Sequence, residues 1–118
     1  ELHNLTDTDN LNVVAFEKET MDKLGLIPEI APRYRATYFS HIIGGYAAGY
    51  YSYLWAEVLD TDAFEAFKEH GVFDKNTADS FRKNILEKGG TEDPMTLYRG
   101  FRGADPSLEP LLKNRGLK

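Results

Sequence analysis

The chain contains 118 residues and carries a net charge of −5, with 42% apolar and 28% charged residues. This composition is typical of a globular protein, and the length suffices for one small domain with a modest core. The missing basic stripe argues against a nucleic-acid partner, and no apolar run is long enough to cross a membrane. The chain has no cysteine, which rules out disulfides and thiolate ligands and fits a reducing compartment. We therefore expect a cytoplasmic protein with neither a nucleic-acid nor a membrane partner.

The first predicted helix follows a polar lead-in, residues 1–8, that shows no apolar periodicity. Asp9 or Asn10 can cap a helix that runs to about Leu24, in which apolar residues alternate with acidic and basic ones. Gly25 is expected to end this helix, because glycine takes the left-handed conformation that closes a helix at little cost.

The next segment, residues 26–32, contains two prolines and is expected to be a connector. Residues 33–41 are ambiguous, since their aromatic and β-branched side chains permit a strand while Pro32 suits the first turn of a short helix. We favour the helix. Two interpretations of Arg33 and Arg35 stay open: both are surface charges, or they hold a carboxylate through two parallel hydrogen bonds.

The most unusual stretch, residues 41–55, contains one histidine, three glycines, four tyrosines and the only tryptophan. Gly44 and Gly45 are expected to form a mobile joint, because glycine adopts backbone angles that are closed to other residues. Three tyrosines follow with the spacing i, i+4, i+7, which places their hydroxyls on one face of a helix. These tyrosines are Tyr46, Tyr50 and Tyr53.

That helix is predicted from Ala47 to about Glu69, with Gly71 ending it. Aromatic residues at helical spacing usually belong to a core. Here, however, the opposite stripe already supplies a broad apolar face, made of Tyr51, Leu54, Trp55, Val58 and Leu59. Three buried hydroxyls would also need three partners, which a substrate or a solvent-filled cleft provides more easily than a core. We therefore predict that the tyrosine face lines a cleft.

The last third of the chain shows three helix starts. Asn76 or Thr77 can begin one helix, which Gly89 and Gly90 would stop. The pairs Asp93-Pro94 and Asp105-Pro106 each combine a capping residue with a proline suited to the first turn. Together with the earlier helices, these signals predict an all-α fold.

The run from Arg33 to Trp55, RYRATYFSHIIGGYAAGYYSYLW, resembles the C-terminal signature of the thimet oligopeptidase family of zinc metallopeptidases. Two downstream segments, EKGGTEDPMTLYRGFRG and DPSLEPLLKNRGLK, agree with that signature. Within the family, the likeness is to the bacterial dipeptidyl carboxypeptidases, and it covers essentially the whole chain. The resemblance implies that residues 1–118 form a single helical segment at the C-terminal end of a far longer catalytic domain.

A catalytic zinc ion needs three protein ligands and one open position. The three histidines, His3, His41 and His70, lie far apart in the sequence, and no H-E-x-x-H motif occurs. His70 also has a structural explanation, because a cation near the last carbonyls of a helix is favourable. The resemblance places the zinc ligands and the general-base glutamate on an upstream helix. We therefore expect zinc in the full-length enzyme, no metal bound by this fragment, and no activity of the fragment alone.

The resemblance also implies roles for individual residues. Tyr53 and Tyr50 would donate hydrogen bonds to the carbonyl oxygen on which negative charge collects in the transition state, and His41 would support that state. The glycine joint would let the segment close over a bound peptide. The implied substrate-binding residues are Tyr46, Gly44 and Gly45. The implied partners are an oligopeptide substrate and the remainder of the parent peptidase chain.

Three functional hypotheses stay open. In the first, the chain belongs to a zinc peptidase that removes C-terminal dipeptides from oligopeptides. In the second, the parent is an endo-acting oligopeptidase of the same family. In the third, the chain is a stand-alone helical module that binds peptides without hydrolysing them.

Overall fold

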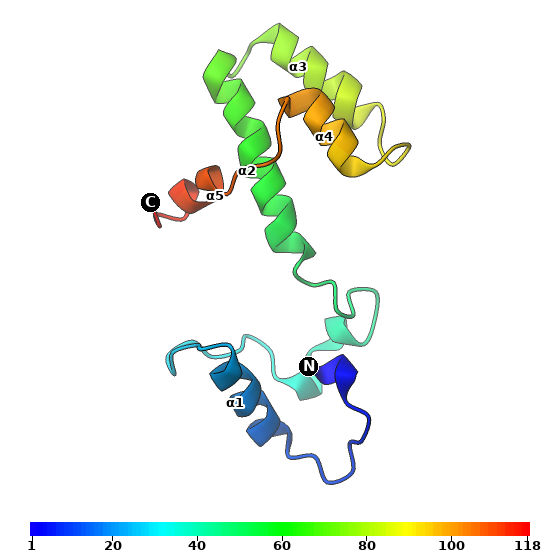
Figure 1. The fold of residues 1–118 in the computed structure, drawn as a ribbon, viewed down its shortest axis with the longest axis vertical. Helices are drawn as coiled ribbons and strands as arrows, with labels where there is room; N and C mark the ends of the chain where they lie inside the picture. The colour runs from blue at the N-terminus through cyan, green and yellow to red at the C-terminus, as the bar shows by residue number, and fades with distance from the viewer. The chain divides into compact units, whose positions relative to one another are not determined.

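The computed structural model describes residues 1–118 and contains five α-helices, three short 3₁₀-helices, one π-helix and no strand (Figure 1). The prediction of an all-α fold is confirmed. The chain divides into two compact units, residues 1–51 (unit 1) and residues 52–118 (unit 2). That both units belong to one segment of a longer catalytic domain stays a prediction.

Unit 1 is built around α1, Val13–Lys23, where the sequence predicts a helix. Its cap is Asn12 rather than Asp9 or Asn10, because the Asn12 side chain accepts a hydrogen bond from the Ala15 amide at 3.1 Å. Asn10 instead takes a positive φ of 61° in the preceding turn. Gly25, with a φ of 70°, follows the helix as predicted.

The rest of unit 1 has little regular structure. A 3₁₀-helix, η1, Leu2–Asn4, lies in the polar lead-in, where the sequence shows no apolar periodicity. The proline-containing segment 26–32 forms no helix, in agreement with the connector prediction. Residues 33–41, for which we favoured a helix, form two 3₁₀ turns: η2, Ala36–Tyr38, and η3, Ser40–Ile42.

The start of the long helix differs from the prediction. The helix was expected to begin at Ala47, but α2 spans Ser52–His70, and residues 43–51 form turns. Gly49 lies inside the predicted stretch, and a glycine in a helix interior costs about 1 kcal/mol relative to alanine. Ala47 has a φ of 24°, outside the helical region. Tyr46, Tyr50 and Tyr53 therefore do not share one helical face.

Unit 2 consists of α2 and three shorter helices (Figure 1). α3, Lys75–Phe81, continues into a π-helix, η4, Arg82–Leu86; α4 is Pro94–Arg102 and α5 is Glu109–Asn114. α3 and α5 pack against α2, and α4 packs against η4. Aromatic rings from α2, α3 and α4 also meet, with Phe81 and Phe101 centroids 5.1 Å apart. The buried apolar core comprises Val58, Ala66, Leu97, Tyr98 and Leu111.

Local capping explains where these shorter helices begin. Asp93 caps α4 through the Thr96 amide at 3.0 Å, with Pro94 in the first turn, as predicted. α3 begins one residue before the predicted start, because Asp74 accepts from the Thr77 amide at 2.7 Å. The prediction for α5 is wrong in position: its cap position is Leu108, and Asp105 is used in an ion pair with Arg99 instead.

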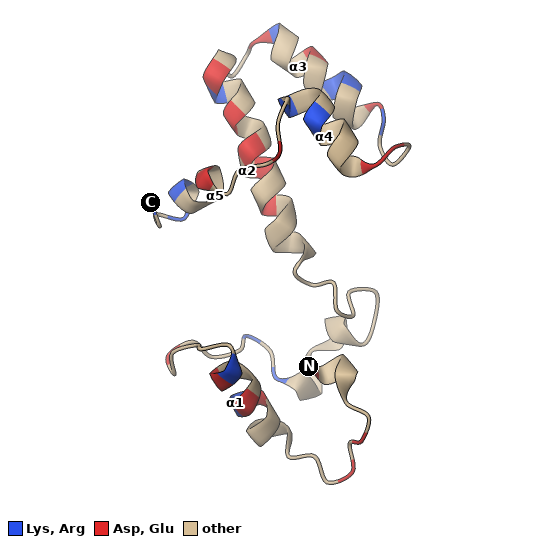
Figure 2. Ribbon diagram, viewed as in Figure 1, with Lys and Arg blue, Asp and Glu red and all other residues tan.

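The charges of unit 2 are arranged in a complementary way (Figure 2). Acidic residues recur along α2, whereas α4 ends in a turn that carries Arg99 and Arg102. Arg102 pairs with Glu69 of α2, and Arg115, just after α5, pairs with Glu57 of α2. The ion pairs thus tie α4 and α5 to the central helix. None of the helices combines the length and apolar character needed to cross a membrane.

Candidate active site

Five aromatic side chains of unit 1 form one connected group, which we call the His41 cluster: Tyr34, Phe39, His41, Tyr46 and Tyr50. The His41 ring lies at its centre, with its centroid 4.9 Å from that of Tyr50 and 5.6 Å from that of Tyr46. Phe39 and Tyr34 complete the group at 5.6 and 6.0 Å from His41. Such offset and edge-on ring pairs are attractive beyond the area they bury.

The cluster is assembled by turns rather than by a helix. η2 and η3 bring Phe39 and His41 together, and the turns of residues 43–51 return Tyr46 and Tyr50 to the same ring. Of the four side chains predicted to act on a substrate, three therefore meet in unit 1. The contact of His41 with Tyr46 and Tyr50 does not depend on the i, i+4, i+7 spacing that predicted a shared helical face.

Gly44 and Gly45, the predicted mobile joint, could each carry a Cβ without a steric clash within this chain. A Cβ at Gly45 would meet no atom within 4 Å, and one at Gly44 would meet only the Ser40 carbonyl at 3.9 Å. Gly49 is tighter, because a Cβ there would lie 3.2 Å from the Tyr46 carbonyl oxygen. The proposed contact of Gly44 and Gly45 with substrate stays a prediction.

Tyr53, the first predicted donor, lies in the first turn of α2 and belongs to unit 2. Its side chain is 58% exposed. Its cooperation with the three clustered residues stays a prediction.

A buried carboxylate in unit 1 was not anticipated from the sequence. Glu17 of α1 is only 8% exposed and accepts two hydrogen bonds, from the Arg35 guanidinium at 2.8 Å and from the Ala36 amide at 2.6 Å. The hydrogen bond from the Ala36 amide, followed by the hydrogen bond from Arg35, lowers the pKa of Glu17 below its ordinary value of 4.5. Arg35 holds this carboxylate through a single hydrogen bond and stays half exposed, so the interpretation in which it holds a carboxylate through two parallel hydrogen bonds stays a prediction.

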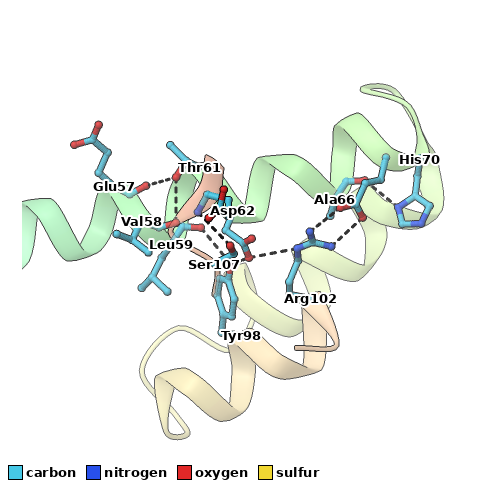
Figure 3. Close-up of polar contacts among 12 residues, drawn as sticks. Glu57, Val58, Leu59, Thr61, Asp62, Ala66, His70, Tyr98, Arg102 and Ser107 are labelled. Atoms are coloured by element: carbon cyan, nitrogen blue, oxygen red, sulfur yellow. Dashed lines mark hydrogen bonds and ion pairs between the residues drawn. The ribbon is translucent and has the colours of Figure 1, made fainter. Parts of the chain in front are cut away.

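Unit 2 contains its own buried polar network (Figure 3). The Tyr98 hydroxyl donates to the Asp62 carboxylate at 2.6 Å, and the Arg102 Nε lies 3.4 Å from the same carboxylate. Arg102 also donates two hydrogen bonds to Glu69, at 3.0 and 2.7 Å. Burial, followed by the bond to Asp62, raises the pKa of Tyr98 far above its ordinary value. Tyr98 therefore stays neutral and joins α4 to α2.

The histidines do not form a metal site. No three His, Cys, Asp or Glu side chains of the chain come together in a way that could hold an ion. His70 lies at the end of α2, where its Nδ1 is 2.9 Å from the Ala66 carbonyl oxygen, in line with the structural role expected for it (Figure 3). The residues of this chain therefore do not fit a zinc ion by themselves.

The sequence model of the family described as "Peptidase family M3" matches residues 1–117 of the chain. The chain belongs to this family. Oligopeptidase A of Escherichia coli is 57% identical over 81 residues, which cover 68% of the chain and 12% of that protein. Oligopeptidase A of Haemophilus influenzae is 43% identical over 118 residues, 98% of the chain and 17% of the relative.

A second kind of M3 relative is also similar. Dipeptidyl carboxypeptidase of Escherichia coli is 44% identical over 114 residues, covering 96% of the chain and 16% of that protein. The chain thus spans between 12% and 17% of the length of these curated relatives. Family membership confirms the resemblance to this family of metallopeptidases.

Proposed function

We propose that this M3 chain is the C-terminal part of a zinc metallopeptidase that removes dipeptides from the C-terminus of oligopeptides. The single observation that carries the proposal is the His41 cluster, in which His41, Tyr46 and Tyr50 meet in a chain that matches a peptidase family over nearly its whole length. The zinc ion and the general base would be held by the rest of the parent protein.

The proposed task of this chain is to stabilise charge. When a peptide carbonyl is attacked, negative charge collects on its oxygen, and a donor already aimed at that oxygen contributes about 2.7 to 4 kcal/mol. A tyrosine hydroxyl suits this task because it donates a hydrogen bond without carrying a charge that must be desolvated. We assign this role to Tyr53 and Tyr50, support of the transition state to His41, and substrate contact to Tyr46.

An endo-acting oligopeptidase is the second candidate, and the relatives named oligopeptidase A favour it. The two candidates differ in whether the enzyme must recognise a free terminal carboxylate. The complete parent protein should be tested on matched peptides with a free and an amidated C-terminus. Loss of cleavage on amidation supports the dipeptide-removing enzyme, whereas equal cleavage of both peptides assigns the protein to the endo-acting class.

The fragment itself should be inactive, because its histidines and carboxylates form no metal site. The 118-residue chain should therefore release no product from a peptide that the complete protein cleaves, with or without added zinc. Peptide hydrolysis by the isolated chain would contradict the proposal that the zinc ion and the general base are held by the rest of the parent protein. Peptide binding by the isolated chain, without hydrolysis or zinc, would favour the stand-alone binding module only if no longer parent protein exists.

The proposed compartment is the cytoplasm. A relative from Arabidopsis thaliana, 55% identical over 84 residues, is named "Probable cytosolic oligopeptidase A". Another from the same plant, also 55% identical over 84 residues, is named as an organellar enzyme. Fractionation of the source cells, with the parent protein followed by antibody, tests the proposal, and recovery outside the cytosolic fraction would contradict it.

A further inference from the structure

The only buried side chain of unit 1 is a carboxylate. Glu17 is 8% exposed, while every other buried residue of the chain lies in unit 2. Removing a charge from water is unfavourable unless it is paired and hydrogen-bonded. Both oxygens of Glu17 are used in this way: Oε2 accepts from Arg35 and Oε1 accepts from the Ala36 amide. α1 is thus joined to two consecutive residues, one through its side chain and one through its backbone.

These two residues lie at the start of the segment that builds the His41 cluster. Ala36 is the first residue of η2, and Arg35 accepts the hydrogen bond from the Tyr38 amide at 3.1 Å that closes this turn. The Glu17 carboxylate therefore fixes both the position and the direction of the backbone as it enters the turn.

One ring just before the anchored pair and one ring three residues after it both contact His41. Tyr34, immediately before Arg35, stacks on Phe39 with centroids 5.0 Å apart, and both rings contact the imidazole at 6.0 and 5.6 Å. Phe39 also packs edge-on against Tyr50 at 5.1 Å. A shift of the anchored backbone would therefore move two of the rings that surround His41.

We propose that Glu17 is a positioning residue, which holds the Arg35–Ala36 backbone so that Tyr34 and Phe39 fix the orientations of His41 and Tyr50. This role rests on the proposed function, since it is through His41 and Tyr50 that Glu17 would influence catalysis. In this proposal both carboxylate oxygens of Glu17 serve the contacts with Arg35 and Ala36. A displacement of about 1 Å at a reacting group can cost as much as a factor of 100 in rate, so a remote anchor of this kind has a measurable effect.

The test uses the complete protein with Glu17→Gln, which keeps the side-chain size but removes the charge that pairs with Arg35. Glu19→Gln is the matched control, because Glu19 lies on the same helix, is 67% exposed and pairs only locally with Lys23. We expect Glu17→Gln to lower kcat about 10-fold or more with KM nearly unchanged, and Glu19→Gln to leave both constants at wild-type values. A loss of stability alone would reduce the active fraction, so kcat is measured per folded molecule.

A second measurement reports the arrangement of the rings around His41 and does not require enzymatic activity. The imidazole carbon-bound protons of His41 lie among aromatic rings, so their NMR signals, identified by their loss in His41→Gln, shift when those rings move. Glu17→Gln should shift these signals and Glu19→Gln should not. If Glu17→Gln fails to fold, Arg35→Lys takes its place, since it keeps the positive charge and changes only the donor geometry.

The two proposals fail in different ways. If the wild-type protein cleaves peptides and Glu17→Gln matches Glu19→Gln in kcat and in the His41 signals, the positioning role is overturned and the proposed function stands. If the wild-type protein cleaves no peptide, the proposed function fails, and a Glu17→Gln shift of the His41 signals still supports the anchor. If the His41 signals of Glu17→Gln are also unshifted, the positioning role of Glu17 is overturned as well.

Discussion

The two units are held together in different ways. Unit 2 has a buried apolar core, four helices and a buried polar network that links α4 to α2. Unit 1 has one helix, turns, a group of ring contacts and a single buried side chain, the carboxylate of Glu17. Its apolar residues are largely at the surface, with Val14 and Leu24 each more than 60% exposed, at 68% and 66%.

This difference matters for the proposed chemistry. Three of the four side chains proposed to contact the transition state or the substrate lie in unit 1, which has a single buried residue, and Tyr53 lies in the first turn of α2 in unit 2. Segments that bind ligands are commonly among the less stable parts of a protein, because they must move. We infer that unit 1 depends on a few specific polar and aromatic contacts, whereas unit 2 depends on its core and its buried network.

The largest effect on stability is expected from Asp62→Ala in unit 2. Asp62 is 3% exposed, and its loss leaves the Tyr98 hydroxyl with only the distant Leu59 carbonyl oxygen at 3.4 Å and Arg102 with Glu69 alone. Removing one partner of a buried ion pair costs roughly 3 to 5 kcal/mol, and we expect a value near 3 because Arg102 keeps one partner. Amide hydrogen exchange of α2 and α4 measures this loss. The control is Asp60→Ala on the same helix, which is exposed, and equal losses in the two variants would show that the network does not matter.

A smaller effect is expected at alkaline pH. The folded state raises the pKa of Tyr98 above its ordinary value of 10.0, so the stabilising contribution of the neutral hydroxyl is complete below about pH 10 and declines as the pH rises above it. Protection of the α2 and α4 amides should therefore fall above pH 10. Tyr98→Phe should cost about 1.5 kcal/mol at neutral pH and should remove this component of the alkaline loss. If the α2 and α4 amides of Tyr98→Phe lose as much protection above pH 10 as those of the wild type, the Tyr98 hydroxyl is not the cause of the loss.

The smallest effect is expected in unit 1 at acid pH. The folded state lowers the pKa of Glu17, so its contribution is present above its ordinary value of 4.5 and is lost as the pH falls through the folded value. Exchange protection of the Ala36 amide, which donates to Glu17, should decrease as the pH falls below the ordinary Glu17 value of 4.5. The same amide in Glu17→Gln should show no such dependence. Protection that follows the same curve in both proteins would rule out Glu17 as its source.

The helices of the fold were largely predictable because helix ends are set locally. Asp93 and Pro94 at the start of α4 and Gly25 after α1 act through neighbouring backbone groups, so the sequence alone is enough to find them. The start of α2 was placed too early, because periodicity gave no weight to Gly49 or to the turn around Ala47. α5 was misplaced because Asp105 pairs with Arg99, a contact that competes with capping.

The candidate site was predictable in its residues but not in its geometry. His41, Tyr46 and Tyr50 were identified from the aromatic stretch and from a family resemblance, yet their contact comes from turns that no periodic pattern indicates. The pairing of Glu17 with Arg35 joins residues 18 positions apart. Nothing in the local sequence marks such a pair, because an acidic residue on an amphipathic helix is normally a surface charge.

The most direct test of the account is the kcat of Tyr53→Phe in the complete protein, measured beside Tyr51→Phe as the control. Tyr51 lies two residues earlier and is 72% exposed, so it tests the general effect of removing a tyrosine hydroxyl at this place in the chain. We predict that Tyr53→Phe lowers kcat by roughly a factor of 100 with little change in KM, as expected for a donor that acts in the transition state, and that Tyr51→Phe retains wild-type kcat. An unchanged kcat in Tyr53→Phe would contradict the claim that this chain supplies the charge-stabilising donors of the peptidase.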